Sequence, residues 1–302
     1  MSDASQSSKR VVFSANWTVT ATGPSAATID VITLNQLTII GQNGAPAINV
    51  TARGCRTLLK ECLITSLDNS GNPTILMNGT TSPTGVLAEM SFDNVSVSTG
   101  SNTNTSCDSV KVTSGRIFAI QSSDFTANSY GKALNILSPG YMLNAALSNF
   151  SANFANTQTA IYLAGANSLT VPATFNTCSI NAKPLTTTYP TVYLASTSGA
   201  YFQFTNCSFY SANTSESPVN AYIYQTGGAA GGRTNNVIVT RCNFQSVSSA
   251  VALTPFQQNA ANFPNNILLY FSDTFQTAGA LTSAGVTLPG GVTGVSAQLP
   301  NK

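Results

Sequence analysis

The sequence predicts an all-β solenoid, a rod built of stacked coils, and three observations support this prediction. A motif of eight positions recurs nine times, with successive copies 25 to 35 residues apart. Repeats of this period are typical of stacked architectures. No segment shows helical periodicity over the roughly 11 residues that a helix prediction needs, and turn-forming residues separate the apolar segments. The last motif position is always Ile, Val or Phe: Ile39, Ile64, Val97, Phe125, Phe150, Ile180, Phe209, Phe244 and Phe275.

Each motif predicts two short strands that meet at a bend. Two residues before its last position stands a small or apolar residue, called here the bend position. Apolar residues also stand three and five positions before the bend position. The spacing of two within each half of the motif is that of a strand with inward-facing apolar side chains, and one extra residue separates the two halves. The residue after the bend position is polar in eight of nine copies and is expected to face outward. The bend positions are Leu37, Cys62, Val95, Ser123, Ser148, Cys178, Cys207, Cys242 and Asp273.

A further strand is expected after most motif copies. Stacked coils place equivalent strands side by side and parallel, and crossovers between parallel strands are overwhelmingly right-handed. The sequence therefore predicts a single-stranded right-handed parallel β-helix of about nine coils over residues 29–277, roughly 40 Å long. Residues 1–28 form an N-terminal arm and cap, and residues 278–302 form a C-terminal cap or extended tail. The further strands are expected at 47–51, 74–78, 109–113, 133–137, 160–164, 191–195, 220–224 and 250–254.

Two copies of the motif carry a resemblance to a known family. Residues 236–244 (NVIVTRCNF) and 202–209 (FQFTNCSF) resemble the coil repeat of right-handed parallel β-helices of the pectin-lyase-like superfamily. The resemblance covers about 80% of the chain and implies the fold. It leaves the activity open, because that superfamily includes polysaccharide lyases, glycoside hydrolases, phage tailspikes, adhesins and non-enzymatic virion parts.

The composition argues against several classes of function. Charged residues make up 7% of the chain, against roughly 25% in an average domain, and a scattered net charge of +2 makes no basic footprint for nucleic acid. The chain has no histidine, the commonest general base and metal ligand. The polar first ten residues do not look like a signal peptide. No apolar stretch approaches the ~18 residues of a membrane span, so no membrane insertion is expected.

Four of the six cysteines stand at bend positions, which favours packing over chemistry. Cys62, Cys178, Cys207 and Cys242 could be a metal or redox site, or a row of reduced thiols in the core, where free Cys behaves as a small hydrophobe. Because there is no Cys-x-x-Cys pair and no His, we expect packed thiols, no metal and no cofactor. Cys55 and Cys107 lie outside this column, and their state is left open.

Three carboxylates on successive coils are the best catalytic candidates if the protein is an enzyme. Glu61, Asp93 and Asp124 lie near the same bend, where stacking could bring them within the ~5–9 Å that glycosidase pairs use. The alternative, which we favour, is a solvated cluster of exposed turn residues. Asp273 would point inward in strict alignment, so we expect an irregular last coil there, with Phe271 and Phe275 inward instead. The cations near the candidate carboxylates are Arg56, Lys60 and Arg116.

Tyrosines in the further strands predict an aromatic surface. If Ala221 and Ile223 face inward, as their counterparts in the two preceding coils do, then Tyr162, Tyr193 and Tyr222 stack on the outer face, with Tyr224 beside Tyr222. The alternative is a register one residue over, which buries Tyr222 and Tyr224. An exposed row could bind sugar rings or form subunit contacts. We expect an interface, because a chain with so little charge needs polar and aromatic contacts for assembly.

These observations favour a non-enzymatic structural protein, such as a tailspike-like or capsid-associated virion component made in a host cytoplasm. Its expected partners are other virion proteins or further copies of itself, for example in a trimer, and surface glycans. Two alternatives of the same fold stay open. One is a carbohydrate-active enzyme, either a polysaccharide lyase or a glycoside hydrolase, and the other is a glycan-binding adhesin without catalysis.

Overall fold

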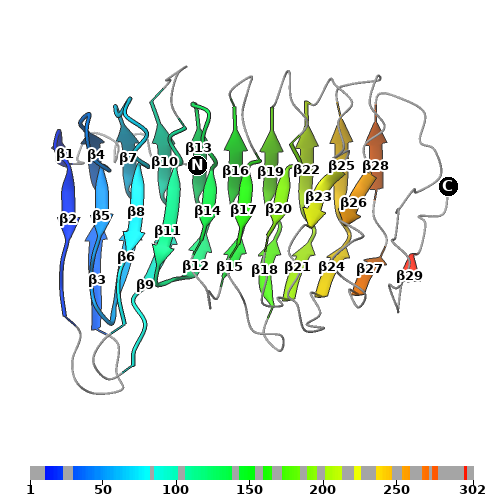
Figure 1. Ribbon diagram of the computed structural model, residues 1–302, viewed down its shortest axis with the longest axis horizontal. Coiled ribbons are helices and arrows are strands. Elements are labelled where there is room, and N and C mark those ends of the chain that lie inside the picture. The colour runs from blue at the N-terminus through cyan, green and yellow to red at the C-terminus, as the bar shows by residue number, and fades with distance from the viewer. Residues whose placement is uncertain are drawn as a thin grey trace, which may run out of the picture.

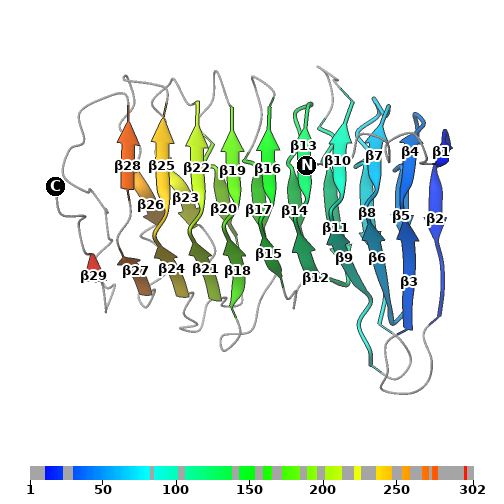
Figure 2. The ribbon, with the colours of Figure 1, turned by 180° about the vertical axis from the view of Figure 1, so that it is seen from behind.

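The described part of the chain is an all-β parallel solenoid. The computed structural model describes residues 11–22, 30–81, 85–100, 106–137, 143–153, 159–164, 172–183, 189–195, 201–212, 221–225, 236–246, 254–258, 267–271, 274–277 and 296–297. Within these ranges the chain forms 29 strands and no helix; none of its described elements is therefore a helix that could cross a membrane. Figure 1 shows the strands stacked side by side along the long axis of the molecule, and the view from behind in Figure 2 shows the same order.

Each coil gives one strand to each of three parallel sheets, which we number in the order that a coil visits them. Sheet 1 contains β3 (Asp30–Asn35), β6 (Cys55–Lys60), β9 (Glu89–Asp93), β12 (Arg116–Gln121), β15 (Asn144–Ala146), β18 (Ala173–Asn176), β21 (Tyr201–Thr205), β24 (Asn236–Thr240), β27 (Ile267–Phe271) and β29 (Ser296–Ala297). Sheet 2 contains β1 (Val11–Phe13), β4 (Leu37–Gly41), β7 (Leu63–Ser66), β10 (Ser96–Thr99), β13 (Asp124–Ala127), β16 (Asn149–Ala152), β19 (Ser179–Ala182), β22 (Ser208–Ser211), β25 (Asn243–Ser246) and β28 (Thr274–Thr277). Sheet 3 contains β2 (Trp17–Val19), β5 (Ile48–Val50), β8 (Ile75–Asn78), β11 (Val110–Ser114), β14 (Leu134–Ile136), β17 (Ile161–Leu163), β20 (Val192–Leu194), β23 (Ala221–Gln225) and β26 (Thr254–Gln258).

The predicted bend between the two strands of the motif is confirmed, and it is made by one left-handed residue. In eight copies the residue before the bend position has a φ between 48° and 56°. This conformation is uncommon outside glycine because Cβ approaches the carbonyl oxygen, yet none of the eight is glycine. Its repetition in every described coil turns the chain from sheet 1 into sheet 2. The eight residues, called here the bend column, are Gln36, Glu61, Asn94, Ser122, Leu147, Thr177, Asn206 and Arg241.

The last motif position forms the centre of the core, as predicted. Its residues pair in register from coil to coil, and the eight whose side chains are described are fully buried. Phe125 stacks on Phe150 with ring centroids 5.3 Å apart, and Phe209 stacks on Phe244 at 4.8 Å. Burying one such side chain contributes about 2 kcal/mol, so this column is a main source of stability. Phe13 pairs with Ile39 and extends the column by one strand toward the N-terminus.

Sheets 2 and 3 both contribute side chains to the core, where they meet. Tyr222 at the start of β23 packs against Phe244 of β25 with ring centroids 5.2 Å apart. The N-terminal strands β1 and β2 extend these two sheets, and Trp17 of β2 packs edge-on against Phe13 of β1. The described segment 11–19 therefore continues the strand order of the solenoid.

One strand prediction needs correction. Phe118, predicted at an inward position, lies in an irregularity of β12 where the register shifts between Ile117 and Ala119. Ile117 takes the inward place and is fully buried, whereas Phe118 is half-buried. Of the last further strand, expected at 250–254, only Thr254 lies within the described residues, and it begins β26. The expectations for Asp273 and for the side chains of Phe271 and Phe275 lie outside the described residues.

The cysteines are free and buried, which confirms the packing interpretation. At the bend, each thiol donates to a main-chain carbonyl of the preceding coil, as Cys62 does to Leu34 O at 3.3 Å and Cys207 to Phe175 O at 3.3 Å. Serines at the same position act similarly, since Ser148 Oγ bonds Ala146 O at 2.7 Å and accepts from the Ser123 amide at 3.1 Å. The bend position thus holds small polar groups that tie successive coils together.

Candidate functional site

The outer face of sheet 3 carries a row of three tyrosines. Tyr162 of β17, Tyr193 of β20 and Tyr224 of β23 are in register on successive coils. The rings of Tyr162 and Tyr193 stack with centroids 5.2 Å apart and an interplanar angle of 25°. Tyr193 and Tyr224 meet edge to face at 5.5 Å. All three are half-buried, so an outer row is present, with Tyr224 as its third member.

The predicted place of Tyr222 on this row is wrong, because Tyr222 is 1% exposed and belongs to the core. It immediately precedes Ile223, which pairs with Val192. The residues that precede the equivalent inward positions in earlier coils are small and fully buried, because the chain turns inward where it enters sheet 3. Tyr222 places a large ring in this column, whose other members are Ala47, Thr74, Ser109, Ala133, Ala160 and Thr191. The alternative register also fails, since Tyr224 faces outward.

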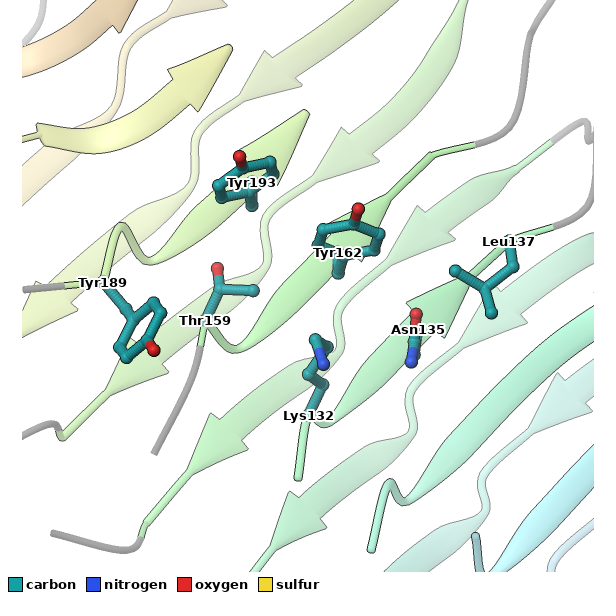
Figure 3. Close-up of a pocket in the computed structure, with 7 residues that line it drawn as sticks. All are labelled: Lys132, Asn135, Leu137, Thr159, Tyr162, Tyr189 and Tyr193. Atoms are coloured by element: carbon teal, nitrogen blue, oxygen red, sulfur yellow. The ribbon is translucent and has the colours of Figure 1, made fainter. Parts of the chain in front are cut away.

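A pocket of about 430 Å³ lies beside the tyrosine row. Figure 3 shows its lining side chains above sheet 3, with Tyr162 near the middle. Two of them are well exposed, Leu137 at 41% and Tyr189 at 38%. The pocket is therefore a partly open hollow with a mixed lining of one leucine, three tyrosines and three polar side chains. Its lining residues, called here the tyrosine pocket, are Lys132, Asn135, Leu137, Thr159, Tyr162, Tyr189 and Tyr193.

The polar side of the tyrosine pocket is fixed by a buried carboxylate. Asp108 accepts from the Lys132 amide at 2.8 Å and from Asn135 Nδ2 at 2.7 Å. The ammonium of Lys132 lies 5.5 Å from the centroid of the Tyr162 ring, within the range of a cation–π contact. Burial lowers the pKa of Lys132; the charge of Asp108 acts against this effect and that of Lys111 adds to it.

The tyrosine row is held together by contacts between its rings. Stacking covers the facing sides of Tyr162 and Tyr193, and Tyr224 closes the row at its other end. Burial, with a contribution from Tyr193, raises the pKa of Tyr162 and of Tyr224, so both hydroxyls keep their protons at neutral pH. Because a sugar ring stacks on the flat face of an aromatic residue, this arrangement suits hydrogen-bonding and edge contacts better than sugar stacking.

The three candidate carboxylates lie on successive coils but occupy three different columns. Glu61 is in the bend column and accepts from Gln36 Nε2 at 2.8 Å. Asp93 ends β9, in register with Lys60 and Gln121. Asp124 begins β13 and is exposed. In the described part of the chain no side-chain hydrogen bond or ion pair joins any two of the three carboxylates.

Sequence reasoning missed the most highly paired carboxylate of this region. Glu89 of β9 is fully buried and lies in register between Arg56 of β6 and Arg116 of β12. Arg56 donates through Nε and Nη2 to Glu89 Oε2 at 2.8 and 2.6 Å, and Arg116 donates through the same two atoms to Oε1. The Arg56 guanidinium also lies 3.7 Å above the Phe118 ring. Arg56 and Glu89 stand six residues before their bend positions, a signal that could have paired them; Arg116 stands seven before its own and reaches this register only through the irregularity of β12.

Within the ranges that the structure describes, no group of three His, Cys, Asp or Glu side chains gathers as metal ligands would. Comparisons with protein-family models, with curated proteins and with solved structures found no match to this chain. The parallel solenoid fold therefore comes from the structure itself, and membership of the pectin-lyase-like superfamily stays a prediction.

Proposed function

We propose that this chain is a non-enzymatic structural protein that acts through assembly contacts along the side of its solenoid. The tyrosine pocket is the observation that carries this proposal. Partly exposed aromatic and aliphatic side chains surround a hollow there, and Tyr162 and Tyr193 use their facing sides to stack on each other. Aromatic residues with a polar tip are enriched at protein interfaces, and contiguous exposed apolar surface commonly marks an interaction site.

The composition supports the same proposal and suggests where such a protein works. A rod with 7% charged residues and a net charge of +2 has little long-range electrostatic repulsion between copies. Low charge, an Asn-, Ser- and Thr-rich surface and a solenoid fold together resemble virion components of tailspike-like or capsid-associated type. The proposed setting is therefore a virion, with the partners being other virion proteins or copies of this chain.

A glycan-binding role is the second candidate, and the polar edge of the pocket favours it over catalysis. The ammonium of Lys132 and the hydroxyls of the lining tyrosines could hydrogen-bond a saccharide that enters the hollow beside Tyr162. A carbohydrate-active enzyme has weaker support, because Glu61 is engaged by Gln36 in the bend column and Glu89 by two arginines.

Light scattering on the purified full chain, combined with a polysaccharide panel, separates these roles. An assembly protein is expected to run as an oligomer and to leave neutral and acidic polysaccharides at full length. Tyr193→Ala should lower the association constant of the oligomer at least tenfold. Tyr210→Ala is the control, because Tyr210 is a half-buried tyrosine on the outer face of sheet 2, and it should leave the association constant unchanged. A monomer that binds or shortens a polysaccharide would contradict the proposal.

A further inference from the structure

Leu147 is an exposed apolar residue at a place where the other coils have polar ones. It lies in the bend column with a φ of 51°, and its side chain is 58% exposed. A bulky side chain is disfavoured in this conformation, and the other seven bend residues are polar or charged. Packing inside the chain therefore gives no reason for a leucine at this bend.

The tyrosine pocket lies at the same level along the solenoid as Leu147. Leu147 joins β15 to β16, and the same coil continues into β17, which carries Tyr162. The pocket extends over the coils of β14, β17 and β20, so Tyr162 is at its middle level. Leu147 lies at the bend between sheets 1 and 2, whereas the pocket lies over the outer face of sheet 3, so the leucine and the pocket are on different sides of the molecule. They cannot meet within one chain.

A matching pair of charges stands one coil earlier. Asp124 begins β13 and is exposed on the side of Leu147. Lys132 precedes β14 in the same coil and lines the pocket on the other side. Along one side of the solenoid, Asp124 is therefore followed one coil later by Leu147. Along the other side, Lys132 is followed one coil later by Tyr162 at the middle of the pocket. Both steps are one coil, about 4.8 Å.

We propose that a second copy of this chain docks on the tyrosine pocket, with its solenoid axis parallel and its coils at the same level. Leu147 of one copy then enters the pocket beside Tyr162, and Asp124 approaches Lys132. An antiparallel copy would reverse the order of charge and leucine and lose one of the two matches. Because the contact joins two different surfaces, it is heterologous and builds either a closed ring or an open array. This inference rests on the proposed assembly function and names its partner.

Replacing Leu147 tests this contact without endangering the fold. Asparagine adopts the left-handed conformation more readily than leucine, so Leu147→Asn should fold at least as well as the parent chain. Sedimentation velocity over a dilution series should show self-association weakened at least tenfold. Leu67→Asn is the matched control, because Leu67 is similarly exposed, at 56%, but lies in another coil, directly after β7. This variant should associate like the parent chain.

A cross-link between two variants tests the geometry. Leu137→Cys places a thiol at the edge of the pocket, and Leu147→Cys places one at the residue that is proposed to enter it. Both leucines are exposed. When the two full-length variants are mixed and oxidised, the account predicts a disulfide between them and little product from either variant alone. The proposed contact would be overturned if Leu147→Asn associated as strongly as the parent chain, or if Leu147→Cys formed disulfide-linked dimers by itself. Neither result would contradict assembly as such. A parent chain that stays monomeric would overturn the proposed function as well.

Discussion

At the scale of single residues, Glu89 shows how this weakly charged chain uses its charges inside the fold. Its carboxylate is fully buried, and each oxygen accepts from a guanidinium, those of Arg56 and Arg116, which are 26% and 27% exposed. Such a group is costly to bury alone but stable when every oxygen is paired. The three residues come from three successive coils, so the cluster ties those coils together on the outer face of sheet 1.

Glu89→Gln is expected to lower the free energy of unfolding by about 3 kcal/mol, because two partly buried arginines lose their counter-charge. Urea denaturation at pH 7 measures this loss. Glu61→Gln serves as the control, since Glu61 makes one partly exposed hydrogen bond to Gln36, and it should change stability by less than about 1 kcal/mol. A loss for Glu89→Gln no larger than that of the control would contradict this role.

Asp68 is a second carboxylate with a structural role. Burial by itself raises its pKa, but bonds from the Ser70 hydroxyl and from the Gly44 and Asn72 amides outweigh burial and lower the pKa to about 2. The unfolded value is near 3.8. The carboxylate therefore stabilises the fold above about pH 4, and this contribution is lost as the pH falls through about 2.

Asp68→Asn should lower stability at pH 7 by about 2 kcal/mol and remove part of the dependence on acid pH. Urea unfolding at pH 7, 4 and 2.5 provides the comparison. The difference between parent and variant is expected to shrink at the lowest pH, because the carboxyl group of the unfolded chain, with a pKa near 3.8, is protonated there. A constant difference across the three pH values would show that the carboxylate charge contributes nothing.

At the scale of structural elements, the bend column is the feature that repeats most strictly. Thr177→Asn should raise the free energy of unfolding by about 1 kcal/mol, because asparagine tolerates a φ near 54° better than a β-branched residue does. Asn206→Thr, in the next coil of the same column, should lower it by a similar amount. Thermal unfolding of the two variants gives the comparison, and shifts of equal sign would refute the explanation.

The cysteine column makes a prediction about reactivity. The neighbouring thiol of Cys207 and burial raise the pKa of Cys178, and the pKa of Cys207 rises to about 12 because Cys242 and burial outweigh the opposing hydrogen bond from Cys178. Since the thiolate is the reactive form, the native protein should release almost no colour with a disulfide reagent at pH 8, and all six thiols should react in urea. Rapid reaction of the native protein would place a thiol at the surface.

The sequence was sufficient for elements that repeat and insufficient for residues that break the repeat. The column from Ile39 to Phe244 is predictable because every coil must fill the same inward place. The outward position of Phe118 was not predicted, because it results from an irregularity in β12. The burial of Tyr222 was not predicted, because a column of small buried residues accepts one large ring at that place. The burial of Glu89 was not predicted, because its carboxylate is stabilised by arginines that lie 33 and 27 residues away in the sequence.

At the scale of the whole molecule, the two sides of the solenoid differ in a way that suits assembly. The side of sheet 3 holds the tyrosine pocket and Lys132, while a different side holds exposed Leu147 and Asp124. A molecule with two complementary sides associates with copies of itself through heterologous contacts. Self-association is the proposal that the low charge and the tyrosine pocket both support.

Native mass spectrometry of the full chain over a dilution series tests this proposal most directly. The account predicts species at multiples of the 31.3 kDa monomer mass, which persist at low concentration and fall apart when Leu147 is replaced by asparagine. A single species of monomer mass at every concentration would contradict the claim that this chain works through assembly.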